Sequence, residues 1–412
     1  MPRIEIPAWV KEFWEELTTP PGFLIPPTSG KQRKNPSGQN NSTPNSSQQR
    51  SSRKKTVYVN EDPPEHDVDI SNKDVNLVLR AKGFSPKVLE QYPFEIIQAV
   101  PVGSVMRLHT SDGTYALKKP PITPKRIQFM SQALNFVSKN GFSGFSRLVP
   151  NKRKSPFTLF GEQVYYVTQW VTGQPADFSN LVHVGEAATA IAQFHRASHG
   201  FESTIYNPSG AFGIERVLQS RTDEFDLFLA KARTKRKPDA VDRFVLRHAP
   251  MYKKQAFQAV KYLEDPRCRN FLSQEEGNPG LCHLDIIAQN LVFTSRNQIY
   301  LIDFDRMSYG PRMLDLGHLI RRSLQTNNWQ RESALVALVQ ANNVEPLRHA
   351  EYRILQAILT FPQSFWRSCH NHYLKQASPY TLARLEQLYE QEQTRQLFLE
   401  DFGQHVDRHR GS

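Results

Sequence analysis

The 412-residue sequence has few cysteines and no long apolar runs. No stretch approaches the roughly 18 consecutive apolar residues of a membrane-spanning helix, so we expect none. The three cysteines, Cys268, Cys282 and Cys369, match no zinc or redox spacing, which predicts free thiols in a reducing compartment. The N-terminus also lacks a basic segment followed by an apolar one, which argues against secretion. These absences predict a soluble cytoplasmic protein.

Residues 26–56 lack acidic, aliphatic and aromatic residues, yet they contain seven of the lysines and arginines behind the net charge of +12. Such a segment cannot bury enough apolar surface to offset the entropy lost on folding. We therefore predict a disordered basic linker over residues 26–73, preceded by an amphipathic segment over residues 1–25. Because aromatic residues are not interleaved with the basic ones, nucleic-acid binding is not favoured.

Within the first 25 residues, a helical pattern covers residues 8–18. Its polar face is net acidic, which disfavours attachment to an anionic membrane. The opposite face is apolar, with Trp9, Val10, Phe13, Trp14 and Leu17. This pattern predicts a helix that binds in an apolar groove, either on its own domain or on a partner protein.

From residue 74 onward, strand patterns give way to helical ones. Strands are predicted at 94–100, 105–109, 114–118 and 163–171. A helix between them, opened by Thr123-Pro124, has the apolar stripe Ile127, Met130, Leu134 and Val137. After Gly173 the patterns are helical, at about 213–232, 238–265, 332–343, 348–376 and 379–400. A single hairpin, with strands at 291–294 and 299–302, interrupts them.

This order predicts an α+β class, two-lobed protein-kinase-like fold. The predicted divisions are a β-rich N-lobe at 74–168, a hinge at 169–176, a helical C-lobe at 177–402 and a tail at 403–412.

The residues that favour phosphoryl transfer lie around the hairpin. His283, Asp285 and Asn290 keep the H-x-D-x-x-x-x-N spacing of kinases, and Asp303 follows the second strand. Asp285 is the candidate catalytic base for a hydroxyl proton, and His283 supports its loop. Asn290 and Asp303, with Asp305 as a further candidate, offer the oxygen ligands that Mg²⁺ prefers. The alternative is that these are ordinary polar residues of turns.

Candidate nucleotide contacts lie upstream. The run Ala-Leu-Lys at 116–118 ends a strand as V-A-I-K does in kinases, so Lys118 is the candidate phosphate contact and Ala116 a wall against adenine. Lys119 is the rival, because only one of two adjacent strand residues points inward. Gly103 lies where a phosphate-covering loop is expected, although G-x-G-x-x-G is absent and a plain hairpin glycine is the alternative.

The connector between the lobes and an acid beyond the hairpin complete the candidate set. Gln169 and Val171 can offer backbone groups to adenine. Asp315 lies among apolar neighbours, where a lone charge is costly, so it either supports the catalytic loop or caps a helix. His195 is expected to be a packed core histidine.

The order of these parts between Asp74 and Phe402 resembles the aminoglycoside phosphotransferase / choline kinase superfamily. Several stretches are more similar to the CotS-type spore coat kinase-like proteins: 115–118, 192–198, 281–285, 302–305, 315–317 and 361–366. The resemblance implies ATP, a metal ion, and a hydroxyl acceptor whose identity the sequence does not show. It gives Asp285 the role of base, Asn290 and Asp303 those of metal ligands, and Lys118 that of phosphate contact. It also implies synthesis in the mother-cell cytoplasm and deposition on the spore coat, with coat-protein partners bound through residues 8–18.

One feature departs from the superfamily pattern. A helix glutamate normally orients the strand lysine, yet no Asp or Glu lies between Lys118 and Glu162. Gln128 and Gln132 are the only long polar acceptors on that helix. Two functions therefore remain open: an active phosphotransferase, or a pseudokinase that serves as a structural protein of the coat.

Overall fold

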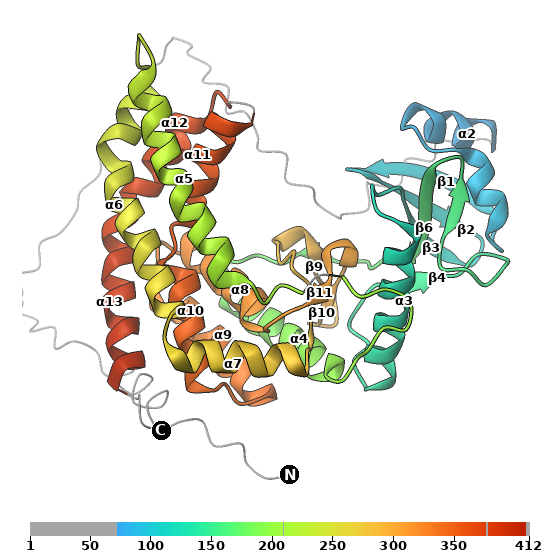
Figure 1. Ribbon diagram of the computed structural model, residues 1–412. Coiled ribbons are helices and arrows are strands. Elements are labelled where there is room, and N and C mark those ends of the chain that lie inside the picture. The colour runs from blue at the N-terminus through green and yellow to red at the C-terminus, as the bar shows by residue number, and fades with distance from the viewer. Residues whose placement is uncertain (1–71, 209, 376–377, 409–412) are drawn as a thin grey trace, which may run out of the picture.

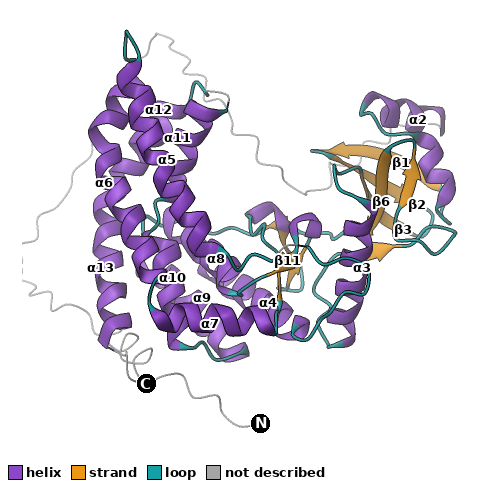
Figure 2. Ribbon diagram, viewed as in Figure 1, coloured by secondary structure: helices purple, strands orange, loops and turns teal. Residues whose placement is uncertain are grey.

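The computed structural model describes residues 72–408 except 209 and 376–377, so the predicted segment 1–25 and residues 26–71 of the predicted linker lie outside the described residues. The described chain forms the expected two-lobed α+β fold. Figure 1 shows a small β-rich lobe beside a larger helical lobe, with the short strands β9, β10 and β11 between them. Figure 2 shows that helix dominates the second lobe. No helix of the described chain is long and apolar enough to cross a membrane.

The N-lobe is built on an antiparallel sheet in the order β1-β2-β3-β6-β4, with β5 also paired to β6. Its main strands are β1 (Ile96–Val102), β2 (Val105–Thr110), β3 (Gly113–Lys118) and β6 (Gln163–Gln169). The shorter elements are α2 (Asn72–Ala81), η1 (Pro86–Gln91), β4 (Leu148–Val149) and β5 (Thr158–Phe160). One face of the sheet packs on α2 and η1, which bury Leu79 and Val88 against Met106 and Leu117.

Helix α3 (Pro124–Lys139) belongs to the N-lobe by sequence but packs into the core of the other lobe. Thr123 caps it, and its side chain accepts a hydrogen bond from the backbone N–H of Arg126. All four residues of the predicted stripe are buried. They join the large apolar cluster of the helical lobe rather than the smaller cluster under the sheet.

The C-lobe contains ten helices in the described chain. They are α4 (Leu181–Ser198), α5 (Ile214–Thr234), α6 (Ala240–Leu263), α7 (Pro266–Gly277), α8 (Met313–Thr326), α9 (Arg331–Val344), α10 (His349–Thr360), α11 (Gln363–Leu374), α12 (Thr381–Glu390) and α13 (Glu392–Arg408). The closest pairs are α4 with α9 and α5 with α6, and α10 packs across α6.

Short strands place the candidate catalytic residues between the lobes. The predicted hairpin is present as β9 (Leu291–Phe293) and β10 (Ile299–Leu301), and β7 (Gln174–Pro175) pairs with β9. A second pair joins β8 (Leu281–Cys282) to β11 (Ser308–Tyr309). The turns η2 (Ala288–Asn290) and η3 (Phe304–Arg306) flank the hairpin.

Several predicted boundaries differ from the structure. The predicted helix 348–376 is two helices, α10 and α11, because Pro362 lacks the N–H needed to continue the first one. The predicted helix 379–400 also divides, near Gln391, and its second part continues to Arg408, past the predicted lobe boundary at residue 402. Helices α7 and α8 were not predicted, and the predicted strand 163–171 ends at Gln169.

Candidate active site between the lobes

Lys118 and Asp303 form an ion pair that joins the two lobes. Lys118 ends β3, and its Nζ lies 2.8 Å from Oδ1 of Asp303. Asp303 has a left-handed φ of 68°, a backbone conformation that costs energy and recurs at functional sites. Its side chain is 38% exposed whereas that of Lys118 is 13% exposed, so the carboxylate keeps a face that can bind a cation. The rival, Lys119, instead donates to the carbonyl oxygen of Gly83 at 2.6 Å.

Asp305 lies close to this pair, but its carboxylate already accepts a hydrogen bond from a tyrosine. The hydroxyl of buried Tyr166 donates a hydrogen bond to Oδ1 of Asp305. Burial is the largest influence on Asp305 and raises its pKa, although the charge of Lys118 and the bond from Tyr166 oppose the change. The geometry therefore favours Asp303 over Asp305 as a metal ligand.

Helix α3 contacts the segment after Asp303 through an arginine. Arg126 donates from Nε to the carbonyl oxygen of Asp305 at 3.2 Å and from Nη2 to that of Met307. Gln132, one of the two long polar acceptors of this helix, hydrogen-bonds Ser203 and Thr204 and not Lys118. Lys118 is thus held by the carboxylate of Asp303 and not by the amide of Gln132.

Asp285 and Asn290 lie together on the catalytic loop. The amide nitrogen of Asn290 donates to the backbone oxygen and to Oδ2 of Asp285, each at 3.0 Å, which leaves the amide oxygen of Asn290 for another ligand. The loop is tied to the residue before Asp303 by two bonds. Ile302 donates its N–H to the carbonyl oxygen of Asn290 at 3.0 Å, and Nε2 of His283 lies 2.9 Å from the carbonyl oxygen of Ile302.

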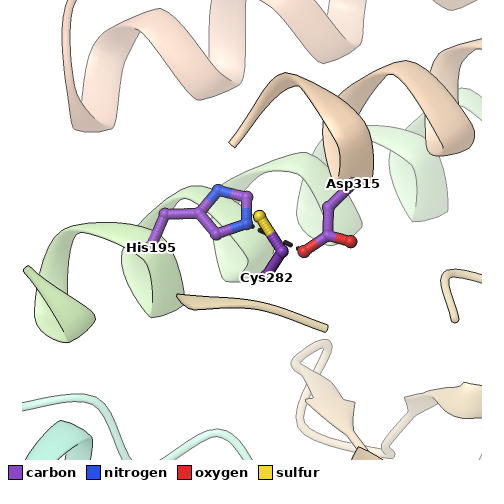
Figure 3. A group of neighbouring side chains, drawn as sticks. All are labelled: His195, Cys282 and Asp315. Atoms are coloured by element: carbon purple, nitrogen blue, oxygen red, sulfur yellow. Dashed lines mark hydrogen bonds and ion pairs between the residues drawn. The ribbon is translucent and has the colours of Figure 1, made fainter. Parts of the chain in front are cut away.

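Asp315 hydrogen-bonds the backbone at the start of the catalytic loop. Its two oxygens accept the backbone N–H groups of His283 at 2.6 Å and Leu284 at 2.8 Å. Oδ2 also lies 2.9 Å from Nε2 of buried His195 on α4 (Figure 3). Burial alone would raise the pKa of Asp315, but the hydrogen bond and charge of His195, with the contributions of His283 and Leu284, lower it. Asp315 lies inside the first turn of α8, whose N-cap is Arg312, so it is not the cap of that helix.

Cys282 completes the buried group drawn in Figure 3, together with His195 and Asp315. Its thiol lies 3.2 and 3.3 Å from the carbonyl oxygens of Gly310 and Pro311. Burial raises the pKa of this thiol well above its ordinary value, which keeps it protonated as a donor. Because both oxygens of Asp315 already have partners, we interpret these three side chains as support for the loop and not as a metal site.

The adenine side of the site is formed by β3 and the connector. Ala116 is buried in β3, and Gly103 lies in the β1–β2 turn with a left-handed φ of 59°. The N–H of Gln169 donates to Arg147, and no described residue accepts from the N–H of Val171. Val171 is therefore the better candidate of the two for an adenine edge.

The donor set fits a divalent metal bound with a nucleotide. A partly exposed carboxylate on Asp303 and a free amide oxygen on Asn290 are hard oxygen donors, and Lys118 supplies a cation beside them. Sequence reasoning missed Tyr166 and Arg126, because a tyrosine in a strand and an arginine on a helix carry no motif. Only the absence of an acid from α3 indicated that another arrangement was needed.

Comparisons with known proteins give a consistent result. Residues 103–356 match the phosphotransferase enzyme family. A crystal structure of an aminoglycoside phosphotransferase from Alicyclobacillus acidocaldarius subsp. acidocaldarius DSM 446 is 32% identical, with a TM-score of 0.74, over 80% of this chain and 99% of that one. Spore coat protein S of Bacillus subtilis (strain 168) is 22% identical over 304 residues, which cover 70% of this chain and 84% of the relative.

A more distant structure shares the fold alone. An amicoumacin kinase, solved in complex with AMP-PNP, Ca²⁺ and Ami, is 14% identical with a TM-score of 0.53 over 78% of this chain and 96% of that one.

Proposed function

This chain belongs to the phosphotransferase enzyme family, and we propose that it transfers the γ-phosphate of ATP to a hydroxyl group. The family membership confirms the predicted superfamily resemblance. The observation that best supports the activity is the position of Asp303. It pairs with Lys118 of the N-lobe and is linked through Ile302 to the loop that holds Asp285 and Asn290. Phosphoryl transfer needs these groups in one place, because most of its catalysis is positioning and charge stabilisation.

In the proposed reaction, Asp285 accepts the proton of the acceptor hydroxyl. The hydroxyl oxygen then forms a bond to the γ-phosphorus while the bond from that phosphorus to the β-phosphate oxygen breaks. The products are a phosphorylated acceptor, ADP and the proton held by Asp285. Lys118 positions the nucleotide phosphates, and Gly103, Ala116 and Val171 border the rest of the nucleotide.

We propose Mg²⁺ as the metal, held by Asp303 and Asn290. Asp305 is a less favoured third ligand, because Tyr166 already donates a hydrogen bond to its carboxylate. Bound there, such an ion would supply positive charge that stabilises the charge developing on the phosphates. The residues of this chain contribute the ligand oxygens, and Lys118 contributes a neighbouring positive charge.

A second candidate function is a catalytically weak structural protein of the spore coat. The similarity to spore coat protein S and the absence of an acid from α3 favour it. It would place the protein first in the mother-cell cytoplasm and then on the coat, with coat proteins bound through residues 8–18. Those residues lie outside the described part of the chain.

ADP formation by the full-length chain tests which function holds. Replacing Asp285 with Ala should lower the turnover rate by about 10²- to 10⁴-fold, the usual contribution of a general base, while Mg-ATP binding stays within about twofold. Asp223→Ala changes an exposed residue of α5 and is the control, which should leave turnover unchanged. If wild type binds Mg-ATP but forms no ADP across a panel of hydroxyl acceptors, the structural function is supported instead.

A further inference from the structure

A cavity of about 250 Å³ lies against the catalytic loop in the helical lobe. Its walls come from α5, from α8 and from the turn between α10 and α11, and Leu284 of the loop closes one side. Leu284 is the residue immediately before Asp285, so the cavity borders the loop that carries the proposed base. Most of the lining is apolar, which suits the body of a small molecule.

The charged groups that line this cavity are all positive, and Gln363 adds a neutral amide. Arg221, His318 and Arg321 line it, and no Asp or Glu does. Burial is the main reason that the pKa of His318 falls to about 3, with the charge of Arg321 next, so this imidazole is neutral at pH 7. The formal charge of the lining is therefore positive.

Neither arginine of the lining has a carboxylate within ion-pair distance among the described residues. Arg321 is only 7% exposed, and its nearest polar partners are the neutral Gln325 at 3.2 Å and Ser364 at 3.5 Å. Arg221 donates to the neutral Gln363 at 2.8 Å and stacks on Trp366. Glu224 acts on Arg221 from outside the cavity, where Trp366 and His370 hold it.

The other two buried arginines in the described part of this lobe each pair with a carboxylate, which Arg321 does not. Arg353 lies 2.5 Å from Asp407, and Arg395 lies 3.0 Å from Glu392. Burial, followed by the charges of Arg322 and Arg367, lowers the pKa of Arg321 to about 9. Arg321 thus stays charged at neutral pH without an anion beside it, an arrangement that is costly until an anion binds.

We propose that this cavity binds the acceptor and that the acceptor is an anion: a hydroxyl compound with an apolar body and a carboxylate or phosphate at its other end. The inference rests on the proposed phosphotransfer and adds the substrate class. Arg221 and Arg321 bind the anionic end, the apolar walls hold the body, and the hydroxyl extends past Leu284 toward Asp285.

This class differs from what the names of the relatives suggest. Aminoglycosides are polyamines and carry positive charge at pH 7. A polycation in this cavity would face two guanidinium groups with no lining carboxylate to bind its ammonium groups.

The test uses four probes: 6-hydroxyhexanoate, 6-hydroxyhexyl phosphate, 1,6-hexanediol and 6-aminohexan-1-ol. They share a terminal hydroxyl on a chain of six carbons, so their lengths are similar although not equal, and they differ in the far-end group, which is a carboxylate, a phosphate, a neutral hydroxyl or an ammonium. Calorimetric titration of the full-length protein without nucleotide should show at least one anion binding about tenfold or more tightly than the diol, with the ammonium compound weakest. Comparing the carboxylate with the phosphate identifies the anionic group.

Arg221→Gln should weaken binding of the preferred anion about tenfold, and Arg321→Gln gives a second variant if the first one unfolds. Arg216→Gln, an exposed arginine on α5 outside the cavity, removes the same charge and should change the affinity less than about twofold. Equal affinities for all four probes, no binding of any, or the same loss in Arg216→Gln as in Arg221→Gln would overturn the inference. ADP formation by the same wild-type preparation, across the panel of hydroxyl acceptors, separates this failure from a failure of the proposed phosphotransfer.

Discussion

At the scale of single residues, Asp315 connects the most parts of the site. It accepts the backbone N–H groups of His283 and Leu284 in the catalytic loop and contacts His195; both histidines are buried, and Leu284 is half-buried. Removing the carboxylate of Asp315 leaves the backbone N–H groups of His283 and Leu284 and the ring of His195 without this partner. The loop geometry around Asp285 therefore depends on a carboxylate that touches no substrate.

Asp315→Asn should destabilise the protein by about 3 kcal/mol or more, because it breaks a buried pair and places an amide N–H against backbone donors. Chemical denaturation measures the loss. Asp226→Asn breaks the exposed pair with Lys253 and should cost less than about 1 kcal/mol. Similar losses in the two variants would contradict the role given to Asp315.

The same pair predicts a pH dependence. The folded-state pKa of Asp315 is lowered relative to the unfolded chain. Its stabilising contribution is therefore fully present above the unfolded pKa of about 4 and is lost as the pH falls through the folded-state pKa. The difference in unfolding free energy between wild type and Asp315→Asn should stay constant from pH 8 to 5 and shrink below pH 4. A difference that grows on acidification would contradict this account.

At the scale of elements, α3 is attached to the segment after Asp303 by Arg126. Both bonds end on backbone carbonyl oxygens, so the contact depends on the guanidinium and not on the identity of the partner side chains. Arg126 therefore links α3 to η3. The same helix contains no Asp or Glu that could pair with Lys118.

Arg126→Ala should lower the free energy of unfolding by about 1–3 kcal/mol and weaken Mg-ATP binding, because η3 follows directly after Asp303. Lys125→Ala changes an exposed cation on the same helix and should alter neither quantity measurably. Equal effects of the two substitutions on denaturation and nucleotide titration would show that the contact is unimportant.

Local patterns in the sequence predicted the elements that depend on neighbouring residues. The stripe on α3, the hairpin β9–β10 and the strands up to Lys118 follow from periodicity and turn residues. Pro362 ends the helical pattern in the sequence, but the predicted helix 348–376 runs through it. The contact of Asp315 with His195 was not predictable, because His195 lies 120 residues away and only the packing of α4 against α8 brings them together.

At the scale of the whole molecule, the two lobes have separate apolar cores, and the polar residues of the candidate site connect the lobes. The sheet of the N-lobe has its own cluster with α2, whereas α3 shares the large cluster of the helical lobe. The ion pair of Lys118 and Asp303 is a polar link from the end of the sheet to the C-lobe. A ligand that binds both residues should therefore couple the lobes.

The most direct measurement is an equilibrium titration of the full-length chain with ATP, with and without Mg²⁺. Wild type should bind ATP tightly only with the metal, Asp285→Ala should match it within about twofold, and Asp303→Ala should lose the metal-dependent binding. The Asp303→Ala protein must first show a cooperative unfolding transition, which establishes that it is folded. If folded Asp303→Ala binds Mg-ATP as wild type does, the site between the lobes is assigned incorrectly.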